Sequence, residues 1–186
     1  MRTLQSMLLA GGLWLSTSLP AWAGGIAIVD FQQAINQVSE GERARAELKA
    51  LEEQKQQEIS DLETQLRQKD EAFSAQVSTY QSQVQMNILT PEARAEREQQ
   101  LGMMQQELMQ LQQTYQQTAM NAEMELQKVY SEKMEIIITK MRAVSESIAQ
   151  EKSIDLVFEV TESGLVFASG SVTDITPDLI TRYNGN

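Results

Sequence analysis

The sequence predicts an α+β protein in which a long antiparallel helical coiled-coil hairpin is inserted in a small β head of about three strands. Apolar residues recur three or four positions apart through two long stretches that a proline-containing break separates, which predicts the hairpin. Short β-branched runs lie before the first stretch and after the second, which predicts the head. These strands can meet only if the helices return to their starting point.

The first 23 residues have the features of a secretory signal peptide. Arg2 gives a positive start, an apolar core follows over residues 7–19, and residues 21–23 form a small-x-small cleavage site. The core is shorter than the roughly 20 residues that span a bilayer as a helix, although a retained membrane anchor is the alternative interpretation. We therefore expect residues 1–23 to be removed from an exported chain that begins at Gly24.

Residues 24–40 are expected to form a strand and a short helix of the head. Residues 26–29 are a β-branched run, after which the apolar spacing becomes helical, with Asp30 as the cap. Residues 39–42 offer a capping box for the next helix, with Gly41 at a kink or a restart.

Residues 41–152 are expected to form the coiled-coil arm, with its turn near residues 89–91. The apolar seam is only one or two residues wide, so each helix buries one stripe against one partner helix. Lys55 and Lys69 interrupt this seam, which predicts looser packing there. A threonine and a proline at the break can cap and start a second helix, which favours a chain reversal over a kinked continuous helix.

Residues 153–186 are expected to complete the head with a β-hairpin and a short helix. Alternating apolar residues over 154–160, a polar glycine-containing turn over 161–164 and an apolar run over 165–169 predict the hairpin. Thr176 and the proline after it can cap the final helix.

The composition argues against an enzyme. The chain has no cysteine and no histidine, which removes thiol catalysis, a disulfide framework and the commonest general base and metal ligand. Asp155, Glu159 and Asp174 gather in the expected head, but outward strand positions and a helix cap explain them more simply. We expect no catalytic residue, no cofactor and no metal.

The charge limits the classes of partner. The chain has a formal charge of −11, and without Arg2 the mature form has 14 basic and 26 acidic residues, or −12. Such a chain is repelled at long range by nucleic acid and by anionic lipid surfaces. Nucleic acid is therefore not an expected partner, and the charge does not indicate peripheral contact with a membrane.

Three segments of the chain resemble the Skp/OmpH family of periplasmic chaperones. They are Ile-Ala-Ile-Val-Asp at residues 26–30, Ile-Asp-Leu-Val at residues 154–157 and Val-Thr-Asp-Ile-Thr-Pro-Asp at residues 172–178. The resemblance covers essentially the whole mature chain. It implies a homotrimer in which the strands join in a central barrel and three arms surround a cavity. It also implies a periplasmic holdase that binds unfolded outer-membrane β-barrel proteins without ATP.

The resemblance stops at the charge, because typical members of the family are strongly basic and this chain is acidic. A lipopolysaccharide site is therefore not transferred to this chain. The main alternative is a structural coiled-coil protein, either an envelope scaffold or an adaptor without chaperone activity. The expected β head favours the chaperone, because a scaffold does not need strands that close on one another.

Two sets of residues are functional candidates. Met103 and Met104 are adjacent and cannot both face one seam, so an apolar tip is expected to contact clients. The residues that we assign to client binding are Met86, Ile88, Leu89, Arg94, Arg97 and Met103. A small head with unpaired sheet edges favours self-association over a monomer or dimer whose strands are covered by short helices. The residues assigned to self-association are Ile26, Ile28, Ile154, Leu156, Phe158, Leu165 and Phe167.

Overall fold

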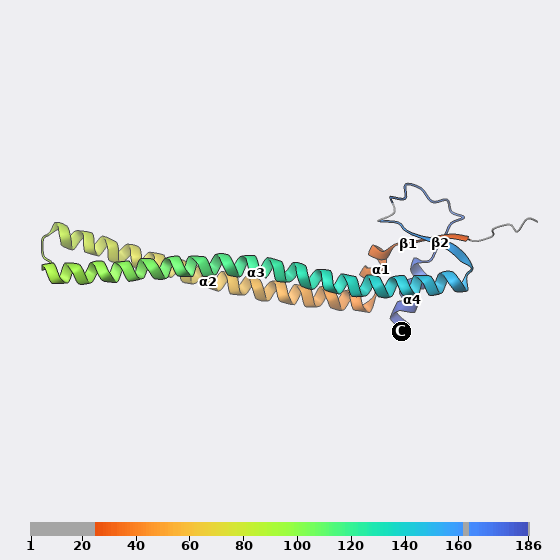
Figure 1. Cartoon of the computed structure of the whole chain (residues 1–186), viewed down its shortest axis with the longest axis horizontal. Coiled ribbons are helices and arrows are strands. Elements are labelled where there is room, and N and C mark those ends of the chain that lie inside the picture. Colours follow the sequence, from red (N-terminus) through yellow and green to blue (C-terminus); the bar gives the residue numbers. More distant parts are fainter. Residues whose placement is uncertain (1–24, 162–163, 186) are drawn as a thin grey trace, which may run out of the picture.

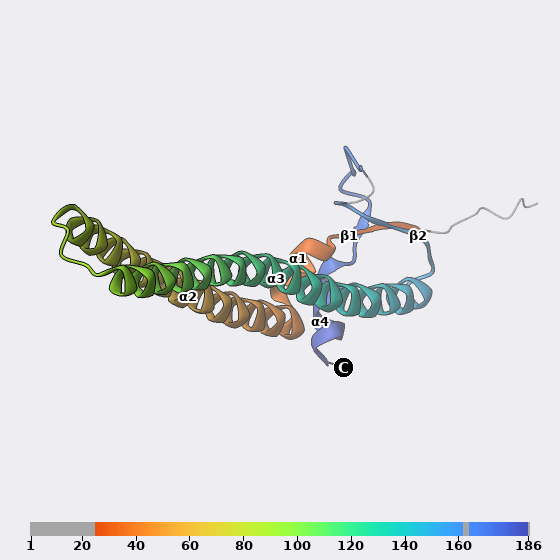
Figure 2. The same cartoon turned by 60° about the vertical axis from the view of Figure 1, so that its left-hand side comes forward.

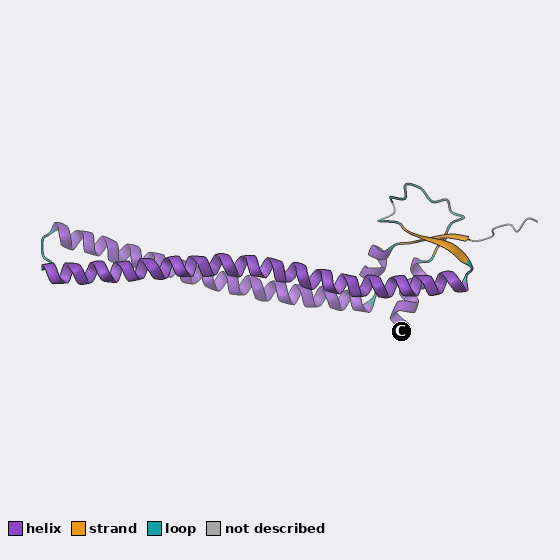
Figure 3. Ribbon diagram, in the orientation of Figure 1, coloured by secondary structure: helices purple, strands orange, loops and turns teal. Residues whose placement is uncertain are grey.

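The computed structural model describes residues 25–161 and 164–185, so the expected signal peptide lies outside the described residues. The molecule is elongated, with a small head at one end of a long helical hairpin (Figure 1). The elements in chain order are β1 (Gly25–Val29), α1 (Phe31–Gln37), α2 (Ser39–Gln85), α3 (Pro91–Glu151), β2 (Ile154–Glu159), β3 (Thr173–Asp174) and α4 (Thr176–Gly185), as Figure 3 shows. The expected combination of long helices and a small three-stranded sheet is confirmed.

The sheet has the strand order β2-β1-β3, and both outer strands run parallel to β1. Parallel strands need a long crossover connection, and here the whole arm provides it between β1 and β2. Ile26 lies opposite Leu156 and Ile28 lies opposite Phe158, with a register shift just before Ile26. The shift gives β2 one extra residue and turns Ile154 to the core side of the sheet, where it packs against buried residues.

The expected β-hairpin is absent from the described residues. Residues 164–172 contain no strand, and the third strand is instead the two-residue β3. Because β3 pairs with the edge of β1 opposite to β2, the chain must cross from one edge of the sheet to the other after β2. The crossing segment lies on the side of the sheet away from α3 in both views (Figures 1 and 2).

The core of the protein lies in the head, where α1, α4 and β1 pack against the last turns of α3. Its fully or nearly buried residues are Ala27, Val29, Ala34, Ile35, Val38, Ala44, Ile137, Met141, Val144, Ile148, Ile175, Leu179 and Tyr183. The strand residues among them alternate with exposed ones, and those on α3 recur three or four positions apart, as one buried face of each element requires. The C-terminal end of α3 is therefore part of the head as well as of the arm.

Caps join the head elements to one another. Asp30 caps α1 as expected, because its carboxylate accepts a hydrogen bond of 2.7 Å from the backbone N–H of Gln33. The expected cap of Thr176 on α4 is wrong: its hydroxyl accepts from the backbone N–H of Asp30, whereas Asp174 accepts from the N–H of Thr176. Thr176 therefore ties the start of α4 to the start of α1.

The expected capping box at residues 39–42 is not formed either. The cap residue of α2 is Val38, which has no side-chain hydrogen bond, and the N–H of Ser39 donates to Asn184 at 2.9 Å. Gly41 instead permits a close approach of two helices. A Cβ at this position would lie 1.9 Å from the backbone oxygen of Ile35, so α1 can turn directly into α2 only because residue 41 has no side chain.

Tyr183 fixes the base of the arm. Its hydroxyl donates a 2.5 Å hydrogen bond to Glu40, and Lys140 lies 4.2 Å from the centre of its ring and 3.6 Å from the Glu40 carboxylate. Burial, together with the bond to the Glu40 carboxylate, raises the pKa of Tyr183 above its ordinary range. This cluster joins α2, α3 and α4 where the hairpin enters the head.

The arm is an antiparallel pair of helices with 47 residues in α2 and 61 in α3. At 1.5 Å per residue these helices are about 70 and 90 Å long. The apolar seam between them is half-buried for most of its length: Ala44 and Ala122 are the outermost fully buried apolar residues on α2 and α3 within the described chain. Most of the stabilising burial is therefore at the head end.

Ion pairs across the seam show its register. Lys55 binds Glu125 at 2.9 Å, Lys69 binds Glu107 at 2.5 Å, and Lys133 pairs with Glu47. The mean of the two residue numbers is 90, 88 and 90 for these three pairs, which is the position of the turn. Residues at equal distances from the turn therefore lie opposite one another. Lys55 and Lys69 are therefore bridges between the helices as well as gaps in the apolar seam.

Replacement of Gly41 by Ala is expected to lower the free energy of unfolding by about 1 to 3 kcal/mol, because the new Cβ collides with backbone that cannot move freely. Gly102 provides a matched control, since it also lies within a helix and a Cβ added there would have no neighbouring atom within 4 Å. Gly102→Ala should raise stability by about 0.5 to 1 kcal/mol. Urea denaturation monitored by circular dichroism measures both changes. Equal effects of the two variants would contradict the close approach at residue 41.

Candidate functional site in the distal arm

The turn of the hairpin presents an apolar tip. Thr90 caps α3 as the sequence predicts, because its hydroxyl accepts from the backbone N–H of Ala93 at 3.2 Å. In the five residues between the helices, the side chains of Met86 and Ile88 are 67% and 63% exposed, and Leu89 is half-buried. Met103 on α3 is 51% exposed, as expected for the member of the Met pair that faces away from the seam.

The two arginines assigned to the tip lie on the first two turns of α3. Arg94 is half-buried, whereas Arg97 is exposed and donates one hydrogen bond of 3.3 Å to Gln100. Neither arginine makes an ion pair among the described residues of the chain. Both cations therefore remain available to an anion from outside the molecule.

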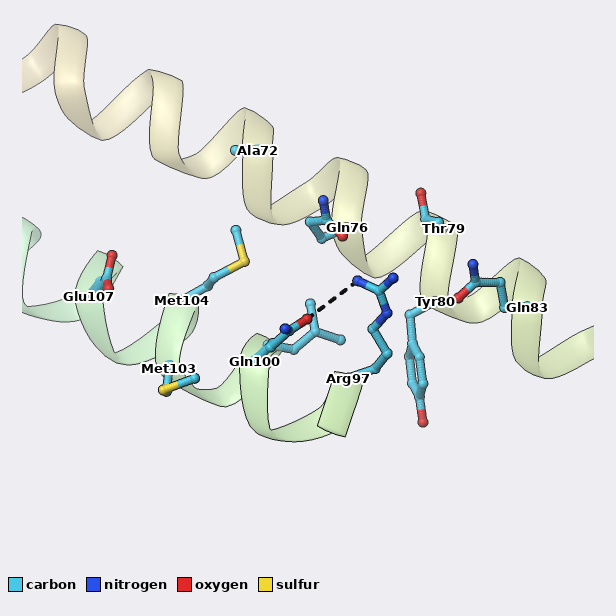
Figure 4. Close-up of a pocket in the computed structure, with 11 residues that line it drawn as sticks. Ala72, Gln76, Thr79, Tyr80, Gln83, Arg97, Gln100, Met103, Met104 and Glu107 are labelled. Atoms are coloured by element: carbon cyan, nitrogen blue, oxygen red, sulfur yellow. Dashed lines mark hydrogen bonds between the residues drawn. The ribbon is translucent and has the colours of Figure 1, made fainter. Parts of the chain in front are cut away.

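Next to the tip, the two helices enclose a pocket of about 340 Å³. Figure 4 shows Arg97 extending from α3 toward α2, between Gln76 and Tyr80, with Met104 pointing toward α2 near Ala72. The residues that line the pocket are Ala72, Gln76, Thr79, Tyr80 and Gln83 from α2, and Arg97, Gln100, Leu101, Met103, Met104 and Glu107 from α3. The pocket brings Arg97 and Met103 together, but its lining does not include Met86, Ile88, Leu89 or Arg94.

Sequence reasoning missed this pocket because helical spacing places Tyr80 and Met104 on the apolar seam, where side chains are expected to pack without leaving a cavity. A signal for it exists in the charge pattern. Residues 72–91 contain no charged residue, and residues 99–122 contain only Glu107. A chain with a charge of −11 therefore has a nearly neutral distal arm, rich in Gln and Met, apart from the charged first turns of α3.

One residue that lines the pocket has a polar atom without a partner. The side-chain oxygen of Gln83 is shielded from solvent, yet no hydrogen-bond donor of the described residues reaches it. A buried acceptor without a partner costs about 1 to 3 kcal/mol, so a rotation of the Gln83 side chain that brings this oxygen to a donor of a ligand would be favoured.

Tyr80 is held at the edge of the pocket by Glu98. The Tyr80 hydroxyl donates a 2.5 Å hydrogen bond to the Glu98 carboxylate, which raises the pKa of Tyr80 above its ordinary value, with a smaller contribution from partial desolvation. The positive charge of Arg94 acts in the opposite direction.

The candidates for self-association divide between two places. Ile26, Ile28, Leu156 and Phe158 share the face of the sheet that the core does not cover, with exposed fractions of 50%, 53% and 41% for Ile26, Leu156 and Phe158. Leu165 and Phe167 are exposed on the crossing segment after β2. Ile154 is separate from both groups, because the register shift places it against the core.

Two acidic residues of the head make hydrogen bonds to the backbone. Asp174 caps α4, and the carboxylate of Glu159 accepts from the backbone N–H of Phe31 at 3.3 Å. Among the described residues, no three acidic side chains gather closely enough to hold a metal ion. Over the same residues, no helix is both long enough and apolar enough to cross a membrane.

Replacement of Glu98 by Gln is expected to lower the pKa of Tyr80 toward 10.0, because it removes the carboxylate that stabilises the protonated phenol. Ultraviolet absorbance during an alkaline titration measures this pKa. The Tyr80→Phe variant identifies which transition belongs to Tyr80. The Glu96→Gln variant is the control for the loss of one negative charge. Since the pKa is raised in the folded state, the stability from this pair is present below pH 10 and is lost as pH rises through the folded pKa. An unchanged titration in Glu98→Gln would show that the hydrogen bond does not form.

Comparisons with known proteins place the chain in a family. A profile described as outer membrane protein (OmpH-like) matches residues 25–183. A crystal structure from Caulobacter crescentus, described as an outer membrane chaperone (OmpH-like), aligns with a TM-score of 0.68 and 15% identity, over 87% of this chain and 85% of that chain. No curated protein matches the chain. The structural likeness establishes a shared fold, and the profile match over almost the whole described chain shows that this protein belongs to the OmpH-like family.

Proposed function

We propose that this chain is a periplasmic, ATP-independent holdase chaperone that binds unfolded outer-membrane proteins and prevents their aggregation. Membership of the OmpH-like family and the description of the Caulobacter crescentus protein as an outer membrane chaperone support this proposal. The observation that carries it is the exposed apolar tip. Met86, Ile88 and Met103 are each at least half exposed, which is more apolar surface than one helical seam can bury.

The tip suits contact with unfolded chains of varied sequence. Unfolded barrel proteins expose alternating apolar residues and free strand edges, through which they aggregate. Methionine side chains are flexible and polarisable, so they adapt to many apolar partners without a fixed shape. The neutral distal arm adds no like-charge repulsion against acidic clients, so apolar contact dominates and binding depends weakly on salt.

The proposal includes a homotrimer. The exposed face of the sheet, formed by Ile26, Ile28, Leu156 and Phe158, is a contiguous apolar surface on a small head. Such surfaces on soluble proteins usually mark an interface. Leu165 and Phe167, which have no strand partner among the residues that the structure describes, would then pair or pack against a neighbouring copy. The number three rests on the family resemblance, whereas the exposed face supports association.

Light scattering of a urea-diluted outer-membrane β-barrel protein tests the function. The mature chain, without ATP, is expected to suppress scattering and form a soluble complex with the β-barrel protein. Met86→Ser, Ile88→Ser and Met103→Ser combined should require about ten times more chaperone for equal suppression, because three apolar contacts are lost.

A matched control replaces the same residue types, two methionines and one isoleucine, at positions nearer the head. Met120, Met124 and Ile136 are 61%, 57% and 61% exposed, and their combined replacement by Ser should leave suppression within about twofold of the parent chain. Equal suppression by the tip variant and the parent would exclude the tip as the contact surface. No suppression by the parent chain would overturn the holdase and favour a structural scaffold.

Leu156→Glu combined with Phe158→Glu is expected to convert the homotrimer to monomers, because burying two carboxylates in an apolar interface is costly. Multi-angle light scattering should give the parent chain three times the mass of the variant. Gln113→Glu with Gln117→Glu on the arm adds the same charge and should leave the mass unchanged. A parent chain with the mass of a monomer would refute the homotrimer, and a double variant of unchanged mass would refute this interface.

A further inference from the structure

The pocket beside the tip is lined by one cation without an ion-pair partner. Of the two charged lining residues, Glu107 is already paired with Lys69 at 2.5 Å, whereas Arg97 has, among the described residues, only the amide oxygen of Gln100 as a partner. A guanidinium group next to neutral residues favours an anion, and it binds a carboxylate well through two parallel hydrogen bonds.

This local charge differs from that of a cavity nearer the head. That cavity, between α2 and α3, is lined by the carboxylates of Glu40 and Glu47 together with Arg43 and Lys133, so its charges compensate one another. Around the distal pocket, residues 72–91 and 99–106 are uncharged, and the carboxylate of Glu98 accepts a hydrogen bond from the Tyr80 hydroxyl. Arg97 can therefore pair with an anion in spite of the acidic charge of the whole chain.

The remaining lining specifies what the anion is attached to. Leu101 and Met104 give the pocket an apolar wall, and the unpaired oxygen of Gln83 requires a donor. A carboxylate, a nearby N–H group and an apolar side chain occur together in the last residue of a polypeptide chain when that residue is apolar. A fatty acid has the carboxylate and the apolar part but lacks the N–H group.

The size of the pocket agrees with such a ligand. Its volume of about 340 Å³ lies at the lower end of ligand pockets, which span about 300 to 1,000 Å³. One terminal residue with its carboxylate suits this volume better than an extended segment does. Met103 lines the pocket and is half exposed, so the preceding residues of a bound chain can contact it.

We propose that the pocket between α2 and α3 binds the C-terminal carboxylate of an unfolded client whose last residue is apolar. Arg97 pairs with the carboxylate, Gln83 accepts from the backbone N–H of the last residue, and Leu101 and Met104 contact its side chain. This inference rests on the proposed holdase function and adds a defined contact to the adaptable apolar tip.

Fluorescence anisotropy with a labelled peptide tests the site on the full mature chain. The probe is Gly-Ser-Gly-Ser-Val-Phe with its label at the N-terminus and a free C-terminal carboxylate. Amidation of that carboxylate should weaken binding about tenfold, since a charge-assisted hydrogen bond is lost. Arg97→Gln should cause the same loss with the free carboxylate and no further loss with the amide. Arg142→Gln, an exposed cation on the same helix near the head, is the matched control and should bind within about twofold of the parent.

Two further measurements separate the possible failures. Equal binding of carboxylate and amide, or unchanged binding by Arg97→Gln, overturns the site. Decanoate and unlabelled peptide are compared as competitors of the labelled peptide. If decanoate displaces it at the lower concentration, the pocket binds a free amphiphile and the client assignment is overturned. Suppression of scattering by the parent chain is measured in parallel: if it persists while the peptide fails to bind, the inference is wrong and the holdase function stands.

Discussion

The parallel pairing of β1 with β2 is the constraint on which the rest of the structure depends. It joins Gly25 to Ile154, two residues with the complete arm between them, so the arm must return to its starting point. The ion pairs across the seam are consistent with that return, because their midpoints coincide with the turn. The same return brings the last turns of α3 under the sheet, where they supply Ile137, Met141 and Ile148 to the core.

Much of this architecture is predictable from local signals. The strand at residues 25–29, the cap of α1, the two long helices and the threonine that restarts the second one all follow from periodicity and capping chemistry, which act over a few residues. The third strand was not predictable, because its position depends on which edge of β1 remains free. Residues 165–169 have the composition of a strand, but the chain passes β2 without pairing there.

The candidate site was predictable in part for a similar reason. Exposure of Met103 follows from helical spacing, since neighbours in a helix point about 100° apart. The pocket is different, because it forms from side chains of two sequence segments, residues 72–83 and 97–107, that the antiparallel register places opposite one another. Ile154 shows a limit of simple alternation: a single extra residue in β2 turns it to the opposite face from Leu156.

Burial is concentrated in the head and at the adjoining end of the arm, and this distribution has a mechanical consequence. A rod clamped at one end and loaded along its length deflects most at its free end. Here the clamp is the head core with the Tyr183 cluster, and the free end carries Met86, Ile88 and the pocket of Arg97. The proposed contact surfaces are therefore located where the elastic cost of displacement is lowest. In the proposed homotrimer, a bound chain would change the separation of neighbouring tips while the sheet at the opposite end keeps its geometry.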